Sequence, residues 1–240
     1  LNSPLYGLDN WIYLGHESSV HTIQFESIFG DKGKEIRYTD DLQAPTLPQN
    51  ANGRGTRFKP DTHQLEMLSS RTQYGHSFDS YGRYFLVNNS NHIYQEIIPQ
   101  HYLERNPDLL GIPTMAFIPE HGNAAEVYPA TSHAEHQLLT DVGVFTSACG
   151  ITIYKGALFP NQYNQVSFVA EPVHNLVHVD KVENNGPVQK ATRMFEGKEF
   201  LTSTDPWFRP VNFYVGPDGA LYVIDYYRKN IEHPEWMSDE

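Results

Sequence analysis

The sequence predicts an all-β protein of the β-propeller type, and three features support this prediction. Aromatic residues make up 13% of the 240 residues, with 15 Tyr and 13 Phe, and such residues are enriched in strands. The 17 Gly and 16 Pro are spread along the whole chain, as in proteins with many short strands and turns. A turn followed by an aromatic strand also recurs at nearly even intervals.

The recurring unit is clearest near the C-terminus, where the turn Asp218-Gly219 leads into a predicted strand at residues 220–224. Glycine supplies the positive φ that a tight hairpin turn needs. Similar turns are predicted at Asn10, Gly82 and Gly150, and the four turn positions are separated by 72, 68 and 69 residues. This spacing predicts a repeated sheet unit.

A propeller blade is a four-stranded sheet, and propellers close with about four to eight blades. The 240 residues hold roughly three to four units of the observed length. We therefore expect residues 1–240 to form one partial propeller domain of a longer chain.

Helix is expected only in two short segments, residues 99–105 and 134–139. Two long loops, at residues 40–55 and 111–137, are candidates for function, because loops on a rigid sheet scaffold often carry it. Further strands are expected at residues 55–67, in residues 166–182 as two strands around Glu171-Pro172, and at residues 188–195.

The formal net charge of −12 argues against a nucleic-acid partner, which would require a basic face. Cys149 is the single cysteine, so an intrachain disulfide, a CxxC zinc site and covalent c-type haem attachment are excluded within this sequence. The sequence has no apolar run near the length of a membrane span, and we do not expect the domain itself to span a membrane.

Several motifs resemble a bacterial family of membrane-bound dehydrogenases and occur in one order over nearly the whole chain. They are RTQYGHSFDSYGRYF (71–85), HYLERNP (101–107), TSACGITIYKG (146–156), EPVHNLVH (171–178), EFLTSTDPWFRPVNFYVGPDGALYVIDYYR (199–228) and IEHPEW (231–236). The family is similar to the soluble glucose/sorbosone dehydrogenases, which are six-bladed propellers that use pyrroloquinoline quinone with calcium. Residues 71–75, RTQYG, depart from those enzymes, which carry Arg-Asn before the Pro and Gly.

The resemblance implies oxidation of a sugar or alcohol by a bound quinone, with electrons passed to a c-type cytochrome. It also implies a periplasmic or extracellular location, with membrane association through parts outside this sequence. The alternative from another functional class is a non-catalytic carbohydrate-binding or assembly propeller within a larger multidomain protein.

Four residues are predicted to bind the quinone: Arg71, Gln73, Arg209 and Arg228. A tricarboxylate cofactor needs planar bidentate donors, which Arg supplies better than Lys. The alternative is that each Arg pairs with a neighbouring carboxylate such as Asp225 and stabilises the packing between blades.

His121, in the long loop, is predicted to be the general base, with His76 as the second candidate. A neutral His can accept the proton of a hydroxyl group as hydride leaves the carbon. The alternative is a loop His that makes a turn hydrogen bond.

His174 and His178, with Glu171 nearby, have the composition of a metal site, but we favour structural hydrogen bonding and predict no metal ligand. Calcium ligation is one interpretation of three turn aspartates, Asp9, Asp79 and Asp218. We favour a structural role in the turn for all three.

Substrate binding is predicted for Trp207, Asp225, Tyr227 and His233. The aromatic rings could form a sugar-stacking platform at the mouth of the propeller, and the alternative is that they form core between blades. For His233 the alternative is a cap at the end of the last strand.

Overall fold

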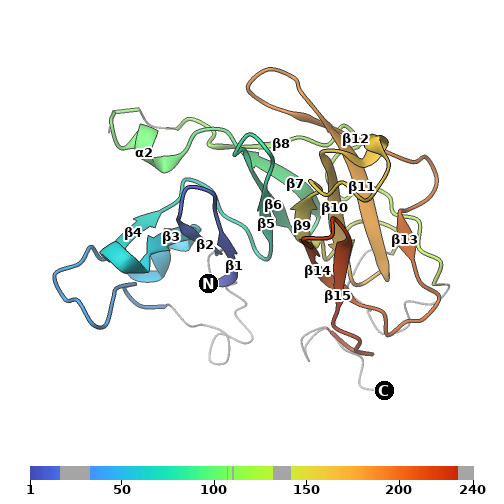
Figure 1. Ribbon diagram of the computed structural model, residues 1–240, viewed down its shortest axis with the longest axis horizontal. Coiled ribbons are helices and arrows are strands. Elements are labelled where there is room, and N and C mark those ends of the chain that lie inside the picture. The colour runs from blue at the N-terminus through green and yellow to red at the C-terminus, as the bar shows by residue number, and fades with distance from the viewer. Residues whose placement is uncertain (17–32, 107, 110, 132–141, 232–240) are drawn as a thin grey trace. The chain divides into compact units, whose positions relative to one another are not determined.

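A computed structural model describes residues 1–16, 33–106, 108–109, 111–131 and 142–231 (Figure 1). It confirms the all-β prediction, because the described strands form four small sheets and the described α-helix, α2 (Gln100–Leu103), has a single turn. None of the four sheets closes on itself within these residues. The same part of the chain holds no helix that is long and apolar enough to cross a membrane.

The chain divides into two compact units. The first comprises residues 1–76 and 96–116, and the second comprises residues 77–95 and 117–240.

The first unit contains a sheet of four strands in sequence order: β1 (Asn2–Tyr6), β2 (Ile12–Gly15), β3 (Thr56–Lys59) and β4 (Gln64–Met67). Each strand pairs antiparallel with the next. The pair β3–β4, joined by a short turn at Pro60–Thr62, confirms the two strands expected in residues 55–67.

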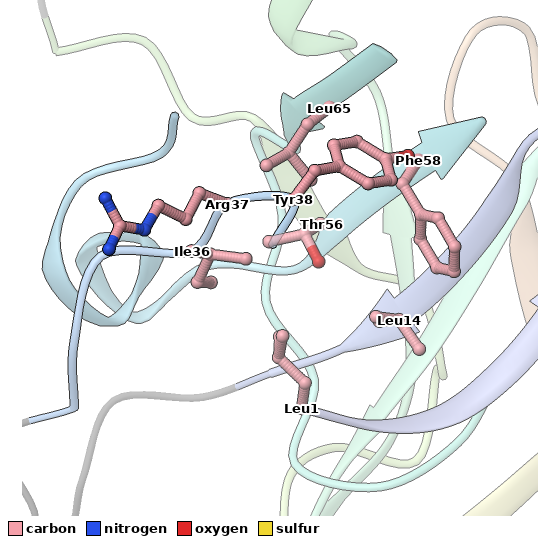
Figure 2. Close-up of a pocket in the computed structure, with 8 residues that line it drawn as sticks. All are labelled: Leu1, Leu14, Ile36, Arg37, Tyr38, Thr56, Phe58 and Leu65. Atoms are coloured by element: carbon pink, nitrogen blue, oxygen red, sulfur yellow. The ribbon is translucent and has the colours of Figure 1, made fainter. Parts of the chain in front are cut away.

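One face of this sheet borders a hollow of about 190 Å³ (Figure 2). Leu14, Phe58 and Leu65 line it from the strands, and Ile36 and Tyr38 line it from the preceding loop. Leu65 also belongs to a small core with the buried Leu47 and Ala51 of that loop. The hollow is therefore bordered mainly by apolar side chains.

The second unit contains a sheet in the order β9 (Cys149–Ile153), β10 (Val166–Glu171), β11 (Leu176–Glu183) and β12 (Lys190–Arg193). β13 (Leu201–Thr202) pairs with the beginning of β11. β10 and β11 confirm the two strands expected in residues 166–182.

Two further sheets complete the described strands. One has the order β5-β6-β7-β8, and the other is the hairpin β14–β15. Their bounds are β5 (His76–Phe78), β6 (Tyr84–Asn88), β7 (Asn91–Glu96), β8 (Met115–Phe117), β14 (Pro210–Val215) and β15 (Leu221–Asp225).

In the β9–β12 sheet, β10 and residues 176–180 of β11 are buried on both faces. The register pairs Phe168 with Val179 and Ala170 with Val177, so these side chains share one face, because side chains alternate along a strand. That face packs against Phe213 of β14 in an apolar core. The opposite face carries polar side chains: Ser167, Glu171, His178 and Asp180, all buried.

The turn prediction is confirmed at Asn10, Gly82 and Gly219, which have φ values of 62°, 77° and 78° and lie between paired or neighbouring strands. It is wrong at Gly150, which lies inside β9, where the pairing with β10 shifts register. The carbonyl oxygen of Val211 lies 2.3 Å from where a Cβ of residue 150 would be. Gly150 therefore permits a close backbone approach instead of turning the chain.

The short helix α2 lies within the predicted segment 99–105. The second predicted helix, residues 134–139, lies outside the described residues. Of the long loops, residues 111–137 contain the strand β8, which the sequence did not predict.

We expect Phe168→Ala to lower the free energy of unfolding by about 3–5 kcal/mol, because it leaves a cavity in the core of the second unit. Phe168 is fully buried, whereas Tyr214 of β14 is 54% exposed and provides the control. Tyr214→Ala should change stability by less than about 1 kcal/mol in the same urea titration. Equal effects of the two substitutions would contradict the assignment of this core.

Candidate metal centre

Four side chains of the second unit converge at the polar face of β11: His92, His121, His178 and Asp180. One potential ligand atom from each lies within 4.8 Å of all the others. The side chains of His92, His178 and Asp180 are at most 1% exposed, and His121 is 14% exposed. No other group of three or more His, Cys, Asp or Glu side chains with metal-site spacing occurs among the described residues.

β11 positions two of the four residues. His178 and Asp180 are two residues apart in the strand, so they project from the same face, while Val177 and Val179 project into the apolar core. The Nε2 atom of His178 lies 3.1 Å from Oδ1 of Asp180. The alternation of the strand therefore places an imidazole and a carboxylate side by side.

β7 supplies His92, whose ring stacks on the fully buried Phe145 with centroids 4.2 Å apart. Nε2 of His92 lies 3.1 Å from Oδ2 of Asp180. The same Phe145 ring lies edge-on to His178, with centroids 5.2 Å apart. Phe145 therefore packs against two of the three imidazoles.

His121 is held by the edge of the β9–β12 sheet. Ala191 of β12 exchanges backbone hydrogen bonds with the segment before it: Glu120 donates to the Ala191 carbonyl, and Ala191 donates to the Ile118 carbonyl. The Nε2 atom of His121 lies 2.9 Å from Nε2 of His92 and 3.6 Å from Oδ2 of Asp180. His121 therefore points into the cluster.

Four of the separations are close to those between ligands that share one ion. Two donors about 2.1 Å from an ion lie about 3.0 Å apart at a right angle and about 3.4 Å apart at the tetrahedral angle. Four separations, of 2.9, 3.1, 3.1 and 3.6 Å, fall around these values, with His178 facing Oδ1 of Asp180 and the other two imidazoles facing Oδ2. The whole set of four ligand atoms spans up to 4.8 Å. Three imidazole nitrogens with one carboxylate are a ligand set for transition metals.

The charges of His178 and Asp180 stabilise each other. Burial by itself would lower the pKa of His178, but Asp180 and Glu199 outweigh it and raise the pKa to about 9. Burial would likewise raise the pKa of Asp180, but His178 and His92 hold it below its ordinary value. At neutral pH a metal ion would therefore have to displace a proton from His178.

The other two imidazoles are neutral at pH 7. Burial lowers the pKa of His92, and burial lowers the pKa of His121 to about 4, in both cases against the opposing effect of Asp180. Neutral imidazole is the form that binds metal ions. Without an ion, the same four groups form a buried hydrogen-bonded network, which is the alternative interpretation of the cluster.

The comparisons with known proteins identify the family of the chain. A family model described as a domain of unknown function, DUF7133, matches residues 1–240. The chain belongs to this family. No curated protein and no solved structure matches the chain. The DUF7133 assignment gives no activity, so the function has to be inferred from the site.

The sequence prediction found part of this cluster. His121 was predicted as a general base, and the structure places its Nε2 among the potential ligands. His178 was predicted to make structural hydrogen bonds, with metal ligation as the alternative. Asp180 and His92 were missed, although the alternation of Val177, His178, Val179 and Asp180 indicates a strand with a polar inner face.

His174 does not share a face with His178, because it lies in the turn before β11 begins. Its Nδ1 lies 3.4 Å from Oε1 of the buried Glu171, and its Nε2 accepts a hydrogen bond from the Gly143 N–H. For His174 the structure shows the structural hydrogen bonding that the sequence favoured.

Arg209 is buried, and its guanidinium donates to backbone carbonyl groups. The acceptors are the carbonyls of Arg228, Pro172, Val173 and Lys229, at 2.7–3.1 Å. These bonds occupy most of the N–H groups of Arg209 and hold neighbouring backbone segments together. The alternative interpretation expected such a packing role, but with carboxylates as the partners instead of backbone carbonyls. Binding of a quinone carboxylate by Arg209 stays a prediction.

The other predicted quinone ligands lie in different places. Arg71 and Gln73 follow β4 in the first unit, where Asn2 donates to the Gln73 carbonyl. Arg228 lies in the second unit and donates to the hydroxyl of Tyr226. Neither unit by itself collects the four predicted residues.

The donor atoms of this cluster are not those that calcium prefers. Calcium takes six to eight oxygen ligands, whereas the cluster offers three imidazoles and one carboxylate. The side chains of Asp9, Asp79 and Asp218 each accept backbone N–H groups within their own turns, as expected for structural turns.

Three of the four predicted substrate-binding residues lie where β14 begins and β15 ends: Trp207 precedes β14, Asp225 ends β15 and Tyr227 follows it. The rings of Trp207 and Tyr227 are 5.7 Å apart and are 44% and 58% exposed. Asp225 accepts the backbone N–H of Tyr227, which has the unusual φ of 42°. These rings are at the surface and not in the core. His233 lies outside the described residues.

His76, the second candidate base, is buried in β5 and donates from Nε2 to the Ser3 carbonyl. Burial lowers its pKa to about 4, despite the opposing effect of this hydrogen bond. It lies in the first unit, whereas the cluster of His92, His121, His178 and Asp180 lies in the second.

We expect His76 to make stability depend on pH. Because its folded pKa of about 4 lies below the ordinary 6.5, the unfolded chain binds this proton first as the pH falls. The stabilisation is complete above pH 6.5, and about 3 kcal/mol is lost between pH 6.5 and 4. Urea titrations across this range should show a steeper loss for the wild type than for His76→Gln, and parallel curves would contradict the assignment.

Proposed function

We propose that this domain binds one divalent first-row transition ion, with Zn²⁺ as the first candidate. The ligands are His92, His121, His178 and Asp180. One observation carries the proposal: three imidazole Nε2 atoms and a carboxylate oxygen converge within 4.8 Å inside one compact unit.

The donor set favours zinc and its neighbours in the first transition row. Imidazole suits zinc, iron, copper and nickel, and a single carboxylate adds one hard oxygen. The only cysteine, Cys149, does not belong to the cluster, so a thiolate-dependent soft site is not supported. Four protein donors are the number that a closed tetrahedral zinc site uses.

The position of the site supports a structural role for the ion. The ligands come from β7, from the segment before residue 122 and from β11, which are far apart in the sequence. The three ligands from strands are almost completely buried. An ion held by all four would link these segments and stabilise the folded state in proportion to its occupancy, by about 2.7 kcal/mol at a free concentration 100 times Kd.

We expect the wild-type chain to bind one equivalent of Zn²⁺ or Co²⁺ and His178→Gln to bind at least about 100-fold more weakly, because one of four ligands is lost. His174→Gln is the matched control, since His174 is also buried and hydrogen-bonded to a carboxylate but lies outside the cluster. Calorimetry and the visible absorption of Co²⁺ measure the binding. A wild-type chain that binds neither ion after chelator treatment and dialysis would contradict the proposal.

We also propose that the sheets are blades of a six-bladed propeller. Two of the sheets have four strands, and a third has four strands plus β13. In each of the three, the four strands are neighbours in sequence order, and β14–β15 would begin a fourth blade. Their first strands begin at residues 2, 76, 149 and 210, close to the period of the sequence repeat.

A second candidate function is the oxidation of a sugar or alcohol, with electrons passed to a c-type cytochrome outside the cytoplasm. It is favoured by the exposed Trp207–Tyr227 pair, because aromatic rings stack on sugar faces. The carboxylate of Asp205, which accepts a hydrogen bond from the Tyr227 hydroxyl, supports it as well. A non-catalytic carbohydrate-binding propeller would use the same surface.

Trp207→Ala should weaken sugar binding by about fivefold or more, since one stacking ring is removed. Tyr81→Ala is the control, because Tyr81 is an exposed aromatic residue elsewhere in the second unit. Binding is measured by affinity electrophoresis on immobilised polysaccharides, and oxidation by dye reduction with added quinone and calcium. Sugar binding without dye reduction would favour the non-catalytic alternative. The absence of both sugar binding and dye reduction would contradict both the dehydrogenase and the carbohydrate-binding proposals.

A further inference from the structure

We propose that Glu199 is the positioning residue of this metal centre. Its carboxylate fixes the tautomer and the orientation of His178 and thereby sets the affinity for the ion. This inference rests on the proposed function, because it concerns the same site.

Glu199 lies directly behind His178, as seen from the cluster. Its side chain is completely buried, and Oε2 lies 2.6 Å from Nδ1 of His178. The opposite ring nitrogen, Nε2, lies 3.1 Å from Asp180. When Nδ1 donates its proton to Glu199, Nε2 is the nitrogen left to bind an ion. A carboxylate in this position also makes the imidazole a stronger donor.

His178 differs in this respect from the other two imidazoles. The Nδ1 atoms of His92 and His121 are buried and have no hydrogen-bond partner among the described residues. Only the orientation of His178 is therefore fixed by a carboxylate at its outer nitrogen. We infer that His178 is the ligand with the fixed orientation, and that Glu199 is the group that fixes it.

Glu199 is itself held in place from a second direction. Its Oε1 accepts the backbone N–H of Tyr128 at 3.1 Å and lies 3.6 Å from Nη1 of Arg193. Arg193 is paired with Asp180 in the β11–β12 register and also donates to the Glu126 carbonyl at 2.5 Å. The carboxylate therefore has partners at both oxygens, which keep it directed at His178.

The test compares the wild-type chain, Glu199→Gln and the control Glu171→Gln. Glu171 is a second fully buried carboxylate that faces a histidine, but His174 is not part of the cluster. Competition titrations with Zn²⁺ and Co²⁺ should show about 10–100-fold weaker binding for Glu199→Gln and a change of less than about threefold for Glu171→Gln. Glu199→Asp keeps the charge and should recover part of the affinity.

The visible spectrum of bound Co²⁺ gives a reading that does not depend on stability. Glu199→Gln should shift its absorption bands, because the donor strength of His178 changes, while Glu171→Gln should leave them unchanged. If Glu199→Gln does not fold, Glu199→Asp carries the same comparison with a smaller expected shift.

The outcomes separate the two proposals. A wild-type chain that binds neither ion overturns the proposed function itself. A wild-type chain that binds, together with a Glu199 variant of equal affinity and spectrum, overturns the positioning role alone. Equal weakening by the Glu199 and Glu171 substitutions, with unchanged Co²⁺ spectra, also overturns it, because a general loss of stability would then explain the effect.

Discussion

The buried pair His178–Asp180 is the interaction on which the second unit depends. Removing one partner of a buried charge pair commonly costs about 3–5 kcal/mol, because the other charge is left without compensation. Here the compensation is shared: Asp180 is also contacted by His92, and His178 is also contacted by Glu199. The strand that carries the pair contributes Val177 and Val179 to the apolar core on its other face. One strand therefore supports both the core and the site.

This arrangement explains why a polar cluster can exist within a well-packed sheet. Buried polar groups are tolerated when they have partners, and a metal ion is one such partner for several of them at once. Phe145 and the backbone bonds of Ala191 hold the surrounding segments against the cluster without adding charge. The four side chains are thus already held close together, which would reduce the ordering that an ion at the proposed site has to impose.

The contacts of Arg209 show the limit of reasoning from a motif. An Arg beside aromatic residues suggested anion binding, yet its guanidinium faces the ends of neighbouring backbone segments. His121 shows the same limit in the opposite direction. Its position in a long loop suggested a catalytic base, and the structure places its Nε2 2.9 Å from Nε2 of His92, inside the cluster.

The sequence by itself determined the β class, the paired strands β3–β4 and β10–β11, and the turns at Asn10, Gly82 and Gly219. These features depend on local backbone preferences and on side-chain alternation, which a short window of sequence contains. Only the tertiary structure decided the candidate site. His92 and Asp180 are separated by 88 residues and meet through the packing of strands in different sheets, which no local pattern specifies. The role of Gly150 was also decided only by the tertiary structure, because it depends on the close approach of the Val211 backbone, which is far along the chain.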